Sequence, residues 1–434
     1  MHESLWTQTA QVPDFPELEQ DETTDVLIVG AGMTGILCAY FLQKAGVPCL
    51  ICEAAKVGSR TSAGTTAVIS AQHDLYFRYV KKFGREKAGL YLRANLEAVE
   101  KYRELCGDIC CDFETCSSFF YTTQEDPQFQ KEVLTLKEFG VPARLHRHIS
   151  IPGDIYAAVE FPGQAQFHPL KFIAALSAGM QIRQGTQIVR IEKNAAYTKT
   201  HRIRAKKILI AAHYPFLGLH GLYPLKLYQK RFYVLALENA AHYEGNYAQD
   251  REDGLYFRNY RDLLLVGGGD HRTGKSGSAY TAVCDFVRQH YPNAVERFSW
   301  SAQDCMSLDG IAYIGAYSRG LKDVYVATGY NEWGMTNAMT AARLLCDAVL
   351  ERPNPYTALF SPNRSMLTSQ LFSNIGITLC DYLLPTTKRC PHMGCALRWN
   401  SSEHSWDCPC HGSRFSPDGS ILDNPATRDA KLDL

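Results

Sequence analysis

The stretch DVLIVGAGMTG, residues 25–35, predicts the beginning of a nucleotide-binding fold. Residues 25–30 form a short apolar run that is typical of a buried parallel strand. Gly30, Gly32 and Gly35 follow in the pattern G-x-G-x-x-G, and the next residues, ILCAYFLQKAG, have helical spacing. A strand, a tight glycine turn and a helix in this order allow a pyrophosphate to approach the backbone at the helix N-terminus.

An acidic residue lies where a ribose contact is expected. A second predicted strand, VPCLICE, ends at Glu53, about 20 residues beyond the glycine turn, as in adenine dinucleotide sites. This motif alone does not separate NAD from FAD. Two later stretches favour FAD: VGSRTSAGTTAVISAQHD, which follows Glu53, and YVATGYNEWGMTNAMTAARLL, which places Gly329, Gly334 and Met335 at a second turn before a helix. The N-terminus of that helix would stabilise the negative charge of a reduced flavin.

Composition excludes several classes of partner. The 434 residues allow two or three domains, and Lys+Arg and Asp+Glu are equal at 45 each, so we expect no nucleic-acid partner. The first twenty residues lack the features of a signal peptide, and no apolar run reaches the roughly 18 residues of a membrane span. We therefore expect a soluble, cytoplasmic protein. Most of the 15 cysteines, including the cluster CGDICCDFETC, are interpreted as structural thiols.

The end of the chain contains a second motif, CPHMGCALRWNSSEHSWDCPCHGSRF, residues 390–415. Cys390 and His392 form one half-motif, and Cys408 and His411 form the other. ALRW and SWDC predict a hairpin that brings both halves to one tip. Two thiolates and two imidazoles from two loops are the ligand set of a Rieske-type [2Fe-2S] cluster. A zinc knuckle is the alternative, but zinc sites more often pair Cys with Cys and His with His. His404, in the hairpin turn, is interpreted as a solvated residue.

Residues 24–365 resemble the FAD-dependent oxidoreductases of the D-amino-acid oxidase type. The resemblance rests on GAGMTG with Glu53, on SRTSAGTTA, on KKILIAAHYPF and on WSAQDCMSLDGIAYIGAY followed by DVYVATGYNEWGMT. It implies FAD as cofactor, with the pyrophosphate on the first glycines and the ribose on Glu53. The cofactor-binding residues implied in this way are Gly30, Gly32, Gly35, Glu53, Arg60, Thr61, Thr65, Thr66, Gly329, Gly334 and Met335.

The C-terminal stretch is similar to Rieske proteins in more than its ligands, because Gly412, Ser413 and Phe415 continue the match. The resemblance implies that Cys390, His392, Cys408 and His411 hold the cluster, and that Cys395 and Cys410 form a disulfide that braces the loops. The segment before Cys390 is shorter than Rieske modules usually have. We therefore expect a truncated module that depends on its cluster and on the flavin domain for stability.

These features predict an α/β fold with a Rossmann-like FAD-binding domain, an inserted, mostly antiparallel α+β substrate domain and a small all-β Rieske-type module at the C-terminus. The predicted divisions are an N-terminal extension at 1–23, the FAD-dependent oxidoreductase at 24–365, a linker at 366–384 and the Rieske domain at 385–434. FAD-binding segments are expected at about 24–90, 150–215 and 300–365, with the substrate domain between them. LLLVGGGDHRTGKSGSAY contains a P-loop pattern with Gly269, Gly274, Lys275 and Ser276, but we interpret it as a strand and turn of the substrate domain.

The predicted function is the oxidation of a small substrate, an amine or amino acid by family resemblance, with electrons passing from FAD to the cluster and then to an unknown acceptor. Candidate substrate contacts are Tyr233, Tyr256 and Arg258, while catalytic residues are not assigned. Two alternatives stay open. One is an NAD(P)H-dependent reductase that feeds the cluster, although the chain has a single G-x-G-x-x-G followed by an acid at the right distance. The other is a redox-sensing flavoprotein without turnover.

Overall fold

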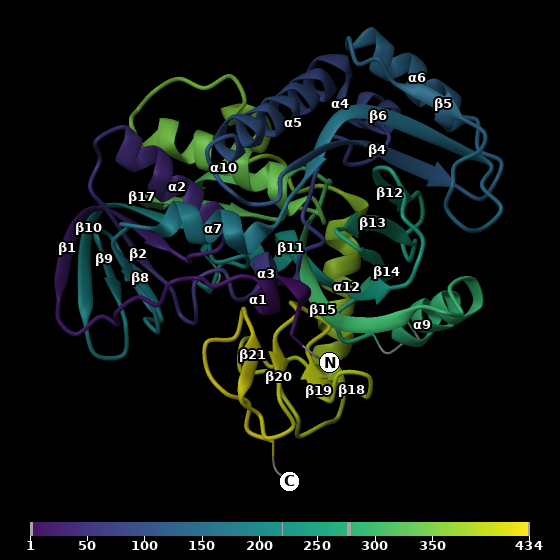
Figure 1. Cartoon of the computed structure of the whole chain (residues 1–434). Coiled ribbons are helices and arrows are strands. Elements are labelled where there is room, and N and C mark those ends of the chain that lie inside the picture. Colours follow the sequence, from purple (N-terminus) through teal and green to yellow (C-terminus); the bar gives the residue numbers. More distant parts are fainter. Residues whose placement is uncertain (1–2, 219, 276–278, 433–434) are drawn as a thin grey trace.

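The computed structural model of the chain describes residues 3–218, 220–275 and 279–432. It contains a largely parallel sheet in the order β16-β17-β10-β1-β2-β7 (Figure 1). The strands of this sheet are β1 (Glu22–Val29), β2 (Cys49–Cys52), β7 (Ile182–Arg183), β10 (Arg202–Ile210), β17 (Leu321–Thr328) and the antiparallel edge strand β16 (Tyr313–Ser318), and the hairpin β8 (Arg190–Glu192) and β9 (Ala195–Tyr197) joins it at β10. The buried apolar run predicted at 25–30 therefore lies within β1, near the centre of this sheet.

A second, mostly antiparallel sheet has the order β15-β11-β14-β13-β12-β4-β6-β3, with β5 paired to β6. Its strands are β3 (Val68–Ile69), β4 (Glu114–Thr122), β5 (Arg144–His146), β6 (Ala157–Gln166), β11 (Leu227–Glu238), β12 (Asn246–Gln249), β13 (Tyr256–Tyr260), β14 (Leu263–Arg272) and β15 (Val295–Ser307). Strand β11 pairs with β15 along its whole length, which makes these two strands the long edge of the sheet.

Helices cover the parallel sheet and link it to the second one. Helix α2 (Met33–Lys44) follows the glycine turn and packs against α10 (Gly334–Val349), which in turn contacts α5 (Arg85–Cys106). These helices contribute Leu37, Met339 and other fully buried side chains to the largest apolar core. The other helices are α1 (Leu5–Thr9), α3 (Thr61–Gly64), α4 (Tyr76–Phe83), α6 (Gln128–Glu138), α7 (Pro169–Ser177), η1 (His220–Leu222), α8 (Tyr223–Lys226), α9 (Ala279–His290), α11 (Thr357–Phe360) and α12 (Ser369–Leu383).

The C-terminal residues form a separate four-stranded antiparallel sheet, seen in yellow in Figure 1. Its strands are β18 (Arg398–Asn400), β19 (Ser405–Asp407), β20 (Arg414–Phe415) and β21 (Ile421–Asp423). β18 and β19 are the hairpin predicted around NSSEH. The segment predicted as a linker at 366–384 contains α12, and the Thr368 side chain caps this helix by accepting a hydrogen bond from the backbone of Leu371.

The predicted FAD-binding segments do not coincide with the two large sheets. β3, β6 and most of β15 lie within segments that were predicted to bind FAD, but all three pair in the second sheet. Hydrophobic periodicity identifies a strand without identifying its hydrogen-bonding neighbour, so the crossings between sheets are not visible in the pattern. The residue boundaries between the FAD-binding and substrate domains therefore remain predictions.

The P-loop pattern lies in the second sheet. Gly269 is on β14, which is antiparallel to both β11 and β13, and Ser276 lies outside the described residues. Gly274 has a specific structural reason to be glycine: a Cβ there would lie 2.7 Å from the backbone nitrogen of Pro409. The glycine thus allows the second sheet and the C-terminal module to approach each other closely.

Candidate active site and cluster site

The glycine turn after β1 is closely packed against its neighbours. Gly30 has φ +106°, and a Cβ at this position would lie 2.6 Å from the carbonyl oxygen of Ala211. A Cβ at Gly35 would collide with the carbonyl of Gly30, and one at Gly32 would lie 3.1 Å from the Ser62 hydroxyl. The absence of side chains is therefore what brings β1, the first turn of α2 and the loop after β10 together.

Glu53 braces this turn from the end of β2. Its Oε2 accepts a hydrogen bond from the backbone N–H of Ala31 at 2.8 Å, and its Oε1 accepts one from Ala55 at 2.8 Å. The carboxylate thereby lies beside the glycine turn at the edge of a large cavity. Its predicted contact with a ribose is compatible with this position and stays a prediction.

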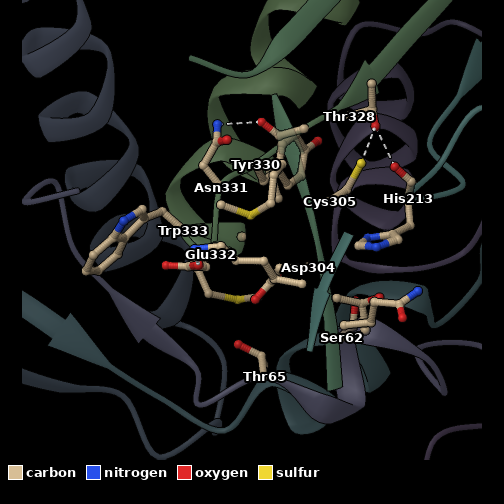
Figure 2. A pocket seen from close by; sticks show the side chains of 18 of the residues that line it. Ser62, Thr65, His213, Asp304, Cys305, Thr328, Tyr330, Asn331, Glu332 and Trp333 are labelled. Carbon is tan, nitrogen blue, oxygen red and sulfur yellow. Dashed lines mark hydrogen bonds and ion pairs between the residues drawn. The ribbon is translucent and has the colours of Figure 1, made fainter. Parts of the chain in front are cut away.

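A cavity of about 730 Å³ runs from the glycine turn to the second sheet. Its volume is in the range of small-molecule and cofactor sites. The predicted FAD residues that line it are Gly30, Gly32, Glu53, Arg60, Thr61, Thr65, Thr66, Gly329, Gly334 and Met335. Gly35, by contrast, lies inside α2 against Gly30. Segments distant in sequence thus form one wall, and Figure 2 shows Ser62 and Thr65 across the cavity from the turn around residue 330.

The second predicted turn lies between β17 and α10 and faces the same cavity. Thr328 donates to the His213 carbonyl at 2.6 Å, and Asn331 donates to the Gly329 carbonyl at 2.7 Å (Figure 2). Asn331 and Glu332 both have left-handed backbone conformations, with φ of 52° and 73°. This sharp turn directs the N-terminus of α10 toward the cavity, as the prediction of a flavin contact requires.

The three candidate substrate contacts have different environments. Tyr256 and Arg258 line the cavity, but Arg258 is buried and donates to the carbonyls of Thr66 at 2.6 Å and Ala67 at 3.0 Å. Its guanidinium is therefore engaged by backbone. Tyr233 lies on the opposite face of β11, where its ring stacks on His271 with centroids 5.8 Å apart. It lines a small separate cavity beside β18 rather than the large one.

The structure also reveals cavity residues that sequence reasoning missed. Lys230 on β11 lies opposite Asp304 on β15 in the backbone register of the two strands, and Asp270 lies on β14. Glu332, on the turn before α10, places its carboxylate 3.4 Å from the Lys230 ammonium. Burial, with a contribution from Glu332, raises the pKa of Asp304 to about 7 and also raises the pKa of Asp270. The available signal was the charge of Lys230 at the start of the strand KRFYVLALE, two residues before Phe232, which also lines the cavity.

The predicted cluster ligands lie together at the tips of two loops. The thiols of Cys390 and Cys408 are both buried, and the rings of His392 and His411 are edge to face with centroids 4.9 Å apart. Burial lowers the pKa of His392 to about 4 and that of His411 to about 3, so both imidazoles are neutral at pH 7. Neutral imidazole is the form that binds a metal.

Two orphaned atoms indicate that this site fits a metal group. The Nδ1 atoms of His392 and His411 are buried and have no hydrogen-bond partner among the described residues. Buried polar nitrogens without a partner are costly, and coordination would satisfy both. Two thiols and two unpartnered imidazole nitrogens match the donor set of a cluster with one iron on sulfur and one on nitrogen.

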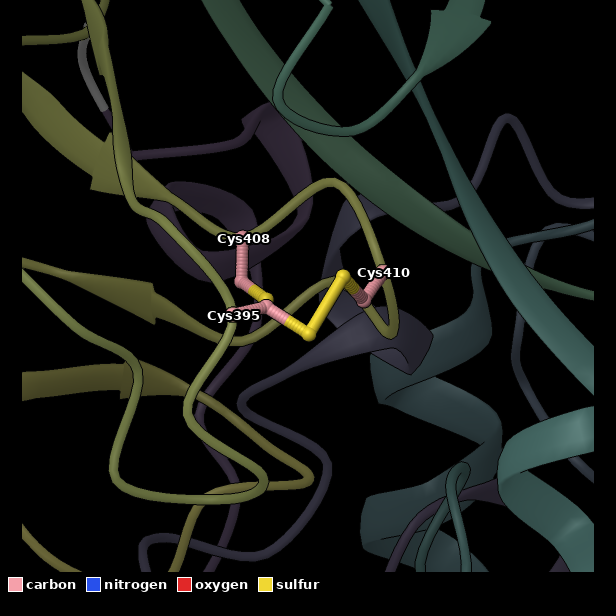
Figure 3. Close-up of side chains that lie close together, drawn as sticks. All are labelled: Cys395, Cys408 and Cys410. Carbon is pink, nitrogen blue, oxygen red and sulfur yellow. A yellow bond between two sulfur atoms is a disulfide. The ribbon is translucent and has the colours of Figure 1, made fainter. Parts of the chain in front are cut away.

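The two loops are joined by the expected disulfide between Cys395 and Cys410 (Figure 3). Cys408 lies beside this bridge, and the sulfur atoms of Cys395, Cys408 and Cys410 lie within 4.8 Å of one another. Backbone hydrogen bonds of 2.9 Å also close each loop, from Gly394 to Cys390 and from Gly412 to Cys408. Covalent and hydrogen-bonded closure thus holds the ligand loops of a module that has a small core of its own.

The C-terminal module packs on the outer face of the second sheet through buried polar contacts. Arg231, only 1% exposed, forms an ion pair with Glu403. Arg272 donates to the carbonyls of Pro409 at 2.9 Å and Cys410 at 3.1 Å. The expected support of the module by the rest of the chain is therefore present in the structure and reaches the ligand loop itself.

Comparison with known proteins agrees with both halves of the chain. Residues 25–348 match the family model described as FAD dependent oxidoreductase, and residues 381–432 match the Rieske [2Fe-2S] domain. The Rieske 2Fe-2S iron-sulfur protein YhfW of Bacillus subtilis is 33% identical over 100% of this chain and 98% of its own length. A cytochrome b6-f complex iron-sulfur subunit of Nostoc is 46% identical over 10% of this chain and 24% of that protein.

Solved structures show the same fold in the larger part. Glycine oxidase from Geobacillus kaustophilus has a TM-score of 0.66 at 18% identity, covering 79% of this chain and 99% of its own. L-proline dehydrogenase from P. horikoshii has a TM-score of 0.67 at 15% identity, covering 79% and 98%. Within the residues that the structure describes, no helix is both long enough and apolar enough to cross a membrane. The chain belongs to the family of FAD-dependent oxidoreductases, and it carries a C-terminal Rieske domain, with FAD and a [2Fe-2S] cluster as its cofactors.

Proposed function

We propose that this enzyme oxidises a small substrate at a C–N bond and passes the electrons within one polypeptide from FAD to the Rieske cluster. The observation that carries the proposal is the alternation of side chains along β11. Tyr228, Lys230 and Phe232 line the cofactor cavity, whereas Gln229 and Arg231 contact the cluster module. The cavity and the cluster loop therefore lie on opposite faces of β11, and Ile421, Asp423 and Asn424 of the module also line the cavity directly.

A chain of hydrogen bonds connects the cavity wall to the cluster loop. His213 lines the cavity, and its Nε2 donates to Oε1 of Gln229 at 3.0 Å. The Nε2 of Gln229 donates to the carbonyl oxygen of His411 at 2.8 Å. One side chain thus connects the cavity wall to the backbone of a proposed cluster ligand, which favours a short electron path between the two sites.

The imidazole of His411 faces the oxidoreductase part of the chain. This residue is 1% exposed, and the ring of Tyr214 lies 6.4 Å from its ring and equally 6.4 Å from the ring of His392. His392, the other proposed imidazole ligand, is only partly buried. We infer that electrons enter the cluster on the His411 side and leave near His392, toward an external one-electron acceptor.

In this scheme FAD supplies two-electron oxidation of the substrate and the cluster supplies one-electron transfer. The substrate carbon loses a hydride and the attached nitrogen loses a proton, which leaves an imine that water hydrolyses to a carbonyl compound and an amine or ammonia. Two successive one-electron transfers to the external acceptor complete the balance. The choice of a C–N bond is supported by the shared fold with glycine oxidase and L-proline dehydrogenase.

An anaerobic experiment tests this function. Purified holoenzyme is mixed with amines, with amino acids and with NADH, while flavin bleaching and the electron paramagnetic resonance signal of the reduced cluster are followed. We expect a nitrogen-bearing substrate to bleach the flavin first and the cluster signal to follow at the same rate in dilute and concentrated protein, because the transfer is intramolecular. Rapid bleaching by NADH alone supports the reductase alternative, and no bleaching by any donor supports the sensor alternative.

Metal analysis tests the cluster separately. We expect two iron atoms per chain, and zinc without iron would contradict the proposed ligand set of Cys390, His392, Cys408 and His411. Replacement of His392 by Cys keeps a metal ligand but removes one imidazole, so the reduction potential of the cluster should fall.

The composition also leads us to propose a cytoplasmic location. Like the identity of the electron acceptor, this location has to be measured.

A further inference from the structure

The cavity contains an unbalanced group of carboxylates on its second-sheet side. Asp304 and Asp270 come from β15 and β14, on either side of Lys230 on β11. Glu332 approaches from the turn before α10, and in Figure 2 its side chain and that of Asp304 reach toward the same part of the cavity. Lys230 is 8% exposed and is the one ammonium within 4 Å of Glu332 among the described residues. Lys230 also lies 3.5 Å from the carboxylate of Glu252, another cavity residue, so four carboxylates share one nearby cation.

The two aspartates differ from other acids of the cavity in having no partner. Asp250, for comparison, accepts from both terminal nitrogens of Arg78, at 2.8 and 2.6 Å. The side chains of Asp270 and Asp304 form no hydrogen bond or ion pair within residues 3–218, 220–275 and 279–432. Both side chains are half-buried at the cavity wall, so a cationic ligand that displaces water there would supply the partner that each carboxylate lacks.

A second observation, at the other end of the same sheet, points to a bound ligand with hydrogen-bonding groups. Ser118 on β4 and Asn246 on β12 both line the cavity and are only 6% and 4% exposed. The Ser118 hydroxyl and the Asn246 side-chain oxygen have no hydrogen-bond partner among the residues that the structure describes. These buried oxygens can accept hydrogen bonds from a bound molecule.

The cationic side chains of the cavity wall that could bind a substrate carboxylate already have other partners. Arg78 is paired with Asp250, and Arg258 donates to two backbone carbonyls. Lys82 donates to the carbonyl of Asp309 at 2.7 Å. An amino-acid carboxylate placed here would meet like charge from Asp304 and its neighbours instead of a free guanidinium, which disfavours it.

Burial raises the pKa of Asp304 to about 7, which suits a base that takes one proton from an amine at neutral pH. We propose, on the basis of the function proposed above, that the substrate is a protonated amine without a carboxylate on its reacting carbon, and that Asp304 and Asp270 bind its ammonium group. The ammonium gives one proton to a carboxylate, and its carbon then loses a hydride to the flavin. Water hydrolyses the resulting iminium to a carbonyl compound and an amine or ammonium.

Matched pairs of compounds test this inference on the holoenzyme. Each pair differs only by the carboxylate: methylamine with glycine, putrescine with ornithine, and phenethylamine with phenylalanine. Binding is measured anaerobically by the change in flavin absorbance, and bleaching is recorded in the same cuvette. We expect at least one amine to bind at least about tenfold more tightly than its amino acid, a factor that corresponds to about 1.4 kcal/mol.

Two variants connect the effect to the aspartates. D304N should weaken binding of that amine by about tenfold, because it removes a charge in a cavity of low dielectric constant. D285N removes an exposed carboxylate on α9 and serves as the matched control, with amine binding unchanged. D304N should leave binding of the amino acid unchanged or improve it, which a general loss of folding would not do.

The outcomes separate this inference from the proposed function. Amino acids that bind as tightly as their amines, or a lack of any spectral response to the amines, would overturn the inference. Amine binding that survives D304N would also overturn it. If an amino acid bleaches the flavin and the cluster is then reduced, the proposed function stands while the inferred substrate class fails. If an amine bleaches the flavin but the cluster stays oxidised, the substrate class stands and the electron transfer fails.

Discussion

Gln229 donates a hydrogen bond from Nε2 to the carbonyl oxygen of His411, 2.8 Å away, across the interface between β11 and the cluster loop. Its Oε1 accepts from His213 at 3.0 Å and from Gln303 at 2.6 Å. All polar atoms of this buried side chain are therefore engaged, and they fix the distance between the cavity wall and a proposed cluster ligand. Gln229 is accordingly a positioning residue rather than a catalytic one.

Q229L should slow electron transfer from flavin to cluster by about tenfold or more. The variant leaves the His411 carbonyl without its donor, and an unsatisfied buried group costs about 1–3 kcal/mol. Stopped-flow absorbance would compare the rate of flavin reduction with that of cluster reduction. Q130L, at an exposed site on α6, is the control. Equal slowing of both steps in Q229L would indicate a general structural defect and contradict the positioning role.

Glu403 should make the attachment of the module dependent on pH. It is 5% exposed and pairs with Arg231 and with Arg414, the latter at 2.6 Å. Burial opposes ionisation, but the two arginines prevail and lower the pKa of Glu403 below its ordinary value of 4.5. A carboxyl group whose pKa is lowered on folding stabilises the fold at any pH above its unfolded-state pKa. That stabilisation is lost as the pH falls through the folded-state pKa.

E403Q should therefore destabilise the protein at pH 7 by about 1–3 kcal/mol, because two buried guanidinium groups lose their shared carboxylate while Arg414 keeps Asp407 and Asp423. The difference from the wild type should shrink as the pH falls below 4.5. Thermal unfolding of the holoenzyme at several pH values measures this effect. E192Q, in an exposed pair on β8, serves as the control. A difference that stays constant over the whole pH range would contradict the ionic role of Glu403.

Some of the site was predictable because it depends on local spacing. Gly35 is required by its contact with Gly30 within the same turn, whereas Gly30 abuts Ala211 and Gly32 lies near Ser62. The spacing of the three glycines is visible in the sequence, although the last two contacts are not. The cluster ligands are similar, since each half-motif lies on one loop and the hairpin between them brings the halves together. Tertiary structure was needed only to show that the Nδ1 atoms of both histidines are unpartnered.

The substrate side of the cavity depends instead on strand pairing and on the choice of face. Asp270, Asp304 and Lys230 come from three different strands. Only the register of β11 with β15 shows that Lys230 and Asp304 lie opposite each other. Tyr233 illustrates the second difficulty. The alternation along β11 was visible, but nothing in it distinguished the cavity face from the module face, because both faces are buried.

D304N should increase stability even as it weakens amine binding. Burial raises the pKa of Asp304 from 3.8 to about 7, so the ionised carboxylate destabilises the folded state above pH 3.8, and the penalty grows until the pH passes about 7. The groups that face it are Lys230, Asp270 and Glu332, and Lys230 reduces the penalty without removing it. The gain in melting temperature for D304N should thus be larger at pH 8 than at pH 5.

Differential scanning calorimetry of holoenzyme at both pH values checks this prediction. D285N, which removes an exposed carboxylate that is paired with Arg288, should show no such pH-dependent gain. A lower melting temperature for D304N at pH 8 would mean that the carboxylate stabilises the resting enzyme and has a partner there.

Gly412 allows the second ligand loop to contact β11 closely. Its φ is +84°, and a Cβ would lie 2.6 Å from Cβ of Gln229. G412A should therefore impose both a left-handed conformation on alanine and a collision with the sheet. Gly46 provides a matched control, since its φ is +74° and nothing lies within 4 Å of an added Cβ. The left-handed strain alone costs about 1–3 kcal/mol, so G46A measures that part and the excess in G412A measures the collision.

The destabilisation of G412A beyond that of G46A should be accompanied by displacement of the cluster loop. We expect G412A to keep its FAD and its flavin bleaching while the cluster is reduced more slowly or is lost during purification, whereas G46A keeps a normal iron content. Iron analysis and electron paramagnetic resonance of both variants make the comparison. Equal iron content and equal rates of cluster reduction in the two variants would show that the loop tolerates displacement from β11, and that close contact with the sheet is not required for electron transfer.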